Sequence, residues 1–270
     1  MQDILAHMRS PQTVQREKRI LLVLGIVALL CGAYALFFGS KTIMLMDMGD
    51  MARSTPAVRN TPQPLPDLSV SSAPGTKLSY FGYEFEVPWD DLDPAKTRAQ
   101  SNNVAIFFRS GKRLMFKSLP PREFVTAIPG KDALRKVVGD APFQSDYTMW
   151  RLILEATPDK VNLLSSRNEI VGVSMLLPIK AIAVPQSAGI FAIQNKDFKG
   201  FQWGDPQHSP GSVVADLFSD DRGLEFIFGT DPKAAGPAVV QADLNRVLQT
   251  VKKAASPPTP PGAPAPRPKR

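Results

Sequence analysis

The residues of this chain that could do chemistry together lie in one short stretch, residues 205–209, which reads Asp-Pro-Gln-His-Ser. In a hydrolase, His208 would act as the general base, Asp205 would orient its ring and Ser209 would be the nucleophile. Triad members usually come from distant parts of a chain, and no Gly-x-Ser-x-Gly elbow is present. A solvated turn between two strands explains the same residues. We therefore expect no catalysis here, with a hydrolase as the alternative.

Metal and cofactor chemistry has few other residues to draw on. The chain has one cysteine and two histidines. Cys31 lies in an apolar run and His7 lies near the N-terminus, so only His208 remains for a folded domain. The sequence has no P-loop, no dinucleotide-binding glycine motif and no His-Glu-x-x-His motif. We expect no cofactor, no metal and, on balance, no enzymatic activity.

Two other features could bind a ligand or react. Phe201 and Trp203 alternate along a predicted strand, where they would be core residues or, if exposed, a surface for a partner. Lys180 lies within an apolar helix. A buried lysine can become a nucleophile, but more often its stem lies along the apolar face and its ammonium group reaches water.

The element that must position all of these residues is the uncharged apolar run of residues 20–38. Roughly 20 apolar residues in a helix span the hydrocarbon core of a bilayer, whereas the apolar part of a cleaved signal is usually about 7–15 residues long. We therefore expect a retained transmembrane helix. Basic residues are more numerous before this run than directly after it, which places the N-terminal stub in the cytoplasm and the remaining chain outside.

Small residues in the run form one helical stripe, since their spacings alternate between three and four. Such stripes let transmembrane helices approach closely, although glycine and alanine are also common in these helices for other reasons. The stripe predicts pairing with another transmembrane helix through Gly25, Ala28, Gly32, Ala35 and Gly39.

Composition divides the chain into five parts. The formal net charge of +7 comes mostly from the two ends, and the central part is nearly neutral, which argues against nucleic-acid binding. Prolines and small polar residues predict a flexible linker before the domain and a solvated tail after it. The expected parts are a basic stub (1–19), a transmembrane helix (20–38), a juxtamembrane segment and Pro/Ser-rich linker (39–76), a globular domain (77–255) and a disordered Pro-rich basic tail (256–270).

Hydrophobic periodicity within the domain predicts strands, then helices, then strands, then a helix. Strands are expected at residues 78–87, 103–109, 113–119, 189–194, 198–203, 212–218 and 223–228. The main helices are expected at residues 146–156, 170–184 and 237–253. Short links between neighbouring strands favour an antiparallel sheet. The predicted fold is therefore α+β: one transmembrane helix, then an antiparallel sheet of about seven strands with helices on at least one face.

Together these observations predict a single-pass membrane protein with a non-catalytic extracytoplasmic domain. The expected partners are the lipid bilayer, a partner protein or envelope component, and a second transmembrane helix, but no nucleic acid. Two alternatives stay open: an extracytoplasmic hydrolase centred on His208, and an accessory subunit that docks through its transmembrane helix.

Overall fold

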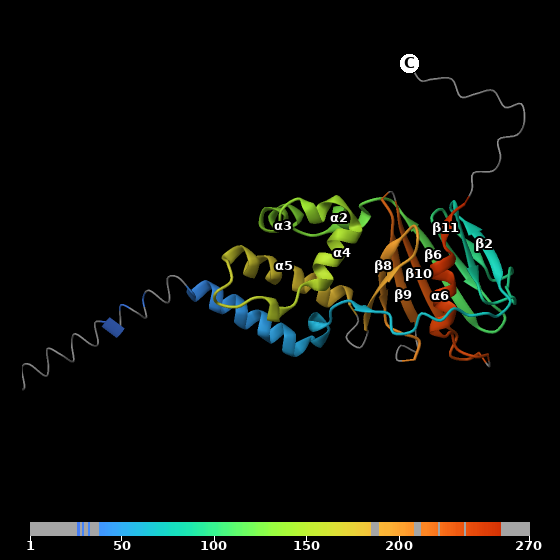
Figure 1. Ribbon diagram of the computed structural model, residues 1–270, viewed down its shortest axis with the longest axis horizontal. Helices are drawn as coiled ribbons and strands as arrows, with labels where there is room; N and C mark the ends of the chain where they lie inside the picture. The colour runs from blue at the N-terminus through green and yellow to red at the C-terminus, as the bar shows by residue number, and fades with distance from the viewer. Residues whose placement is uncertain are drawn as a thin grey trace, which may run out of the picture.

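The computed structural model describes residues 26, 27, 29, 32, 38–184, 189–207, 212–220, 222–234 and 236–254. The fold is a mixed α+β arrangement with a large sheet and helices packed on it (Figure 1). The sequence-based prediction of the class is confirmed. The predicted spanning segment, residues 20–38, falls mostly outside the described residues.

The large sheet has eight strands in the order β1-β7-β8-β9-β10-β6-β5-β4. Neighbouring strands are antiparallel except at one edge, where β1 pairs with β7 in parallel. The prediction of about seven antiparallel strands was therefore incomplete, because it missed two-residue edge strands that carry no periodicity. The strands are β1 (Gln63–Pro64), β4 (Arg98–Ala99), β5 (Asn103–Phe107), β6 (Lys112–Leu119), β7 (Ile190–Gln194), β8 (Lys199–Trp203), β9 (Ser212–Phe218) and β10 (Gly223–Thr230).

One face of the large sheet is covered by a small sheet and the last helix. The predicted strand over residues 78–87 is a tight hairpin, because Phe81 and Gly82 turn the chain with positive φ. Alternating apolar residues of the hairpin, the helix and the large sheet form the main core, in which Phe85, Phe116 and Phe226 contact one another. The elements of this layer are β2 (Thr76–Tyr80), β3 (Tyr83–Val87), α6 (Gln241–Thr250) and β11 (Lys252–Lys253).

A layer of helices covers part of the other face. Two of its helices begin with capping boxes, at Ser145 with Thr148 and at Ser166 with Glu169. The second box and the helix that follows it were predicted from the sequence. The layer contains α2 (Glu123–Ala127), α3 (Lys131–Val138), η2 (Ala141–Gln144), α4 (Asp146–Glu155), η3 (Pro158–Lys160) and α5 (Arg167–Ala183).

A helix over residues 38–54, which we call the N-terminal helix, packs beside α5 (Figure 1). Met48 and Ala52 are buried against Ile170 and Leu177 of α5. At the start of the helix, Lys41 Nζ donates to the carbonyl oxygens of the loop that precedes α5. The N-terminal helix is therefore part of the folded core. Within the part of the chain that the structure describes, no helix is long and apolar enough to cross a membrane.

Residues 60–75, which we call the strap, cross the molecule after η1 (Pro56–Arg59). Composition predicted a flexible coil here, but the strap is fixed to the domain by hydrogen bonds. Asn245 Nδ2 donates to the carbonyls of Asp67 at 2.9 Å and Ser69 at 2.7 Å, and Arg246 Nη1 donates to the carbonyl of Ser71 at 2.9 Å. The strap lacks apolar residues to bury, so α6 holds it through its backbone.

Candidate functional site

The predicted hydrolase residues are only partly described. His208 and Ser209 lie outside the described residues. Asp205 follows β8, and its Oδ1 accepts a hydrogen bond from the backbone N–H of Gln207 at 2.9 Å. This is an Asx turn, in which a side chain fixes a local bend of the chain. The structure therefore gives Asp205 a turn-forming role and leaves the triad a prediction.

Phe201 and Trp203 do not form an exposed partner surface. Phe201 is 2 % exposed and Trp203 is 6 % exposed. Tyr147 of α4 stacks on Phe201 with ring centroids 5.5 Å apart, and Trp150 meets Trp203 edge-on at 5.5 Å. The expectation of a surface is corrected: both rings lie beneath the helical layer and join it to the sheet.

The small-residue stripe is described at two of its five positions. Gly25, Ala28 and Ala35 lie outside the described residues. At Gly32 and Gly39, an added Cβ atom would have no neighbour within 4 Å. These two glycines therefore have open space beside them in the single chain, and helix pairing stays a prediction.

Lys180 is fully buried, contrary to the expectation that its ammonium group reaches water. Its Nζ donates to the carbonyls of Leu154 at 2.7 Å and Ala156 at 2.8 Å, at the C-terminal end of α4. Burial lowers the pKa of Lys180 to about 8, and the positive charge of Lys160 lowers it further. The two carbonyls are unpaired ends of a helix, so Lys180 caps α4.

A second buried charged group lies in the sheet. Asp216 of β9 is directly opposite Glu225 of β10, which is opposite Lys117 of β6. Asp216 Oδ1 is buried and has no hydrogen-bond partner among the residues that the structure describes. Burial raises the pKa of Asp216 to about 8, Glu225 also raises it, and Lys117 lowers it. No group of three or more metal-binding side chains occurs in the described part of the chain.

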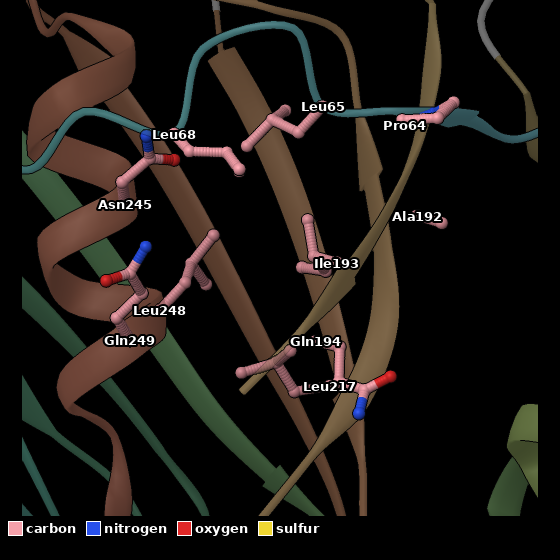
Figure 2. Close-up of a pocket in the computed structure, with 10 residues that line it drawn as sticks. All are labelled: Pro64, Leu65, Leu68, Ala192, Ile193, Gln194, Leu217, Asn245, Leu248 and Gln249. Atoms are coloured by element: carbon pink, nitrogen blue, oxygen red, sulfur yellow. The ribbon is translucent and has the colours of Figure 1, made fainter. Parts of the chain in front are cut away.

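The site that the structure adds is a groove between the strap, β7 and α6 (Figure 2). The groove has a volume of about 220 Å³. Leu65 and Leu68 come from the strap, Ile193 and Gln194 from the edge of the sheet, and α6 forms the opposite wall. The remaining lining residues are Pro64, Ala192, Leu217, Asn245, Leu248 and Gln249.

The groove exists because the strap leaves the sheet early. β1 pairs with β7 only at Phe191 and Ala192. Beyond Pro64 the strap turns towards α6, and the described strands leave the outer side of Ile193 and Gln194 without a neighbour. The groove therefore combines a free strand edge with an aliphatic floor. None of its ten lining residues is charged.

A row of amides holds the wall of the groove in place. Asn245 Nδ2 donates to the strap, while its Oδ1 accepts from Gln241 Nε2 at 3.0 Å. Gln241 also exchanges hydrogen bonds with the fully buried Gln202 of β8. Sequence reasoning missed this site, because its parts come from three distant segments. The one local signal was two polar residues, Gln241 and Asn245, one turn apart on the predicted final helix.

Comparison of the chain with protein-family models, with curated proteins and with solved structures found no match.

Proposed function

We propose that this chain is a single-pass membrane protein whose extracytoplasmic domain binds an extended segment of a partner protein without catalysis. The apolar run of residues 20–38 supplies the anchor, and the basic residues before it favour a cytoplasmic stub. The site for the partner is the groove between the strap, β7 and α6. The free edge of β7 beside that groove is the observation that carries the proposal.

The N-terminal helix supports a domain held close to the membrane. It begins at the last residue of the apolar run and is buried against α5 at Met48 and Ala52. An anchor that continues into a packed helix fixes the orientation of the domain as well as its distance from the bilayer.

The groove supports recognition of an extended chain. An added strand can hydrogen-bond to a free sheet edge, and pockets beside the edge select alternate side chains. Here the edge is at Ile193 and Gln194, and the aliphatic floor includes Leu217 and Leu248. An aliphatic side chain of the partner suits this floor. The absence of charge among the lining residues favours selection by shape and apolar contact.

Photo-crosslinking in native membranes tests the binding site. A photoreactive amino acid replaces Gln194 or Gln249, which are exposed at the groove, or Gln144, which is an exposed glutamine in η2 that does not line the groove. We expect one discrete crosslinked polypeptide from positions 194 and 249, and none from position 144. The polypeptide should disappear when Leu68, which is 69 % exposed at the rim, is changed to glutamate. Equal crosslinking at all three positions, or none at the groove, would refute the proposal.

A further inference from the structure

We propose that the loop before α5, residues 162–166, inserts the side chain of Leu164 into the interfacial layer of the bilayer beside the anchor. The inference rests on the proposed membrane anchor and is independent of the proposed groove. It assigns a lipid contact to a part of the folded domain that lies far from the apolar run in the sequence.

Leu164 is presented to solvent by an ordered turn. Its side chain is 92 % exposed, the highest fraction of any large apolar side chain in the described part of the chain. The backbone N–H of Leu164 donates to Asn162 Oδ1 at 2.8 Å, and Ser165 Oγ accepts from the N–H of Asn162 at 3.1 Å. These bonds hold the loop in a shape that points a leucine away from the domain, which removes no apolar surface from water unless something covers it.

The N-terminal helix fixes the level of this loop. Lys41 Nζ donates to the carbonyl of Ser165 at 2.7 Å and to that of Leu163 at 3.4 Å. The same Nζ lies 5.8 Å from the centre of the Phe38 ring, and Phe38 is the last residue of the apolar run. The loop therefore lies beside the end of the anchor. Figure 1 likewise shows α5 beginning at the end of the domain where the N-terminal helix enters.

Distances along the helix place this end of the domain in the interface. A helix rises about 1.5 Å per residue, so Lys41 lies roughly 4.5 Å beyond Phe38 and Ile43 roughly 7.5 Å beyond it. The polar interfacial layer is roughly 5–8 Å thick on each side of the hydrocarbon core. Ile43 is itself 62 % exposed. Two exposed aliphatic side chains from different segments thus share the depth at which lipid would cover them.

The charged groups around the loop suit an interface rather than a dry interior. Lys41, Arg167 and Glu169 surround the start of α5, and Arg167 and Glu169 are exposed. Lys41 has an aliphatic stem and a charged end, a side chain that commonly lies with its stem against apolar groups at membrane surfaces. The committed occupant is therefore the lipid interface.

The test measures lipid contact at three single cysteines in the full chain, with the native Cys31 changed to alanine. Leu164→Cys probes the loop, Val27→Cys probes the apolar run, and Leu68→Cys is the control, an exposed leucine on the strap. Each variant carries an environment-sensitive fluorophore in vesicles of phosphatidylcholine and phosphatidylglycerol that contain nitroxide-labelled lipid. Leu164 and Leu68 are both largely exposed, so substitution at either position should leave the fold intact.

We expect headgroup-region nitroxides to quench the label at position 164 several-fold more than the label at position 68. Acyl-chain nitroxides should quench the label at position 27. Equal quenching at 164 and 68, with quenching retained at 27, would overturn the loop contact and leave the anchor standing. A label at 27 that no lipid quenches would overturn the anchor itself. Protection of position 164 from water-soluble quencher without lipid quenching would show a protein contact and would also overturn the inference.

Discussion

At the scale of single residues, Lys180 shows how a charge can serve a helix end. The sequence placed a lysine in an apolar helix but could not show what its ammonium group meets. The structure places Nζ between two carbonyls at the end of α4, far from any carboxylate that an item of sequence spacing could suggest. Its partners are backbone atoms, which every residue has, so no side-chain pattern marks them.

Removing that amine should weaken the fold. Lys180→Met leaves the carbonyls of Leu154 and Ala156 buried without a donor, and we expect the free energy of unfolding at neutral pH to fall by about 1–3 kcal/mol. Chemical denaturation of the full chain in detergent micelles measures the change. Lys136→Met, at an exposed lysine of α3, is the control and should alter stability by less than about 0.5 kcal/mol. An equal effect of the two variants would contradict the capping role.

The same pair of variants predicts a pH dependence. Burial lowers the pKa of Lys180 from 10.5 to about 8. Between these values the unfolded chain holds the proton and the folded protein does not, so the contribution of Lys180 to stability rises with pH. The loss caused by Lys180→Met should therefore grow above pH 8, by at most about 1.4 kcal/mol per pH unit. A loss that shrinks over this range would show that the lysine stays charged.

Asp216 predicts the opposite slope. Its pKa rises from 3.8 to about 8 in the folded protein, so the folded state holds a proton that the unfolded chain has released. The stability contributed by this group is present below pH 3.8 and is lost as pH rises towards 8. Asp216→Asn cannot ionise, so its stability relative to the unchanged protein should increase over that range. Denaturation at a series of pH values measures this, with the exposed Asp132→Asn as a control whose difference stays flat.

At the scale of elements, the N-terminal helix is held by a few buried contacts. Met48 is 2 % exposed against α5, whereas Met46, two residues earlier, is 64 % exposed. Met48→Ala should lower the free energy of unfolding by about 2 kcal/mol and speed amide hydrogen exchange in residues 38–54. Met46→Ala makes the same chemical change on the open face and should do neither. Similar exchange in both variants would mean that the helix does not depend on α5.

The strap offers a second test at this scale. Asn245→Ala removes two hydrogen bonds to strap carbonyls, so we expect amide exchange between residues 65 and 70 to accelerate while the main core stays protected. Gln249→Ala, on the exposed side of the same helix, should leave exchange in the strap unchanged. A strap that stays protected without Asn245 would show that other contacts hold it, and the groove wall would need another explanation.

Elements with strong local patterns were predictable and those fixed by distant contacts were not. The capping box at Ser166 and the apolar run after it predicted α5, and alternating residues predicted the long strands of the sheet. The edge strand β1 and the strap were missed, because Pro64 and its neighbours read as linker and are ordered only by β7 and α6. The groove was missed for the same reason, since its two sides are joined only in the fold.

At the scale of the whole molecule, the large sheet separates two surfaces. The helical layer and the N-terminal helix lie on the side where the chain enters, while α6 and the small sheet cover the other face (Figure 1). In our account the first side faces the membrane, and the groove beside α6 is left open to a partner. Both proposals therefore depend on which side of the membrane the domain occupies.

The most direct test of this account is the topology of the full chain in a bacterial inner membrane. An enzyme that is active only outside the cytoplasm is fused after Arg270, and a second fusion at the same point carries a reporter that works only in the cytoplasm. The account predicts an active first fusion and a silent second one, both recovered with the membrane. An active cytoplasmic reporter with a silent external one would contradict it.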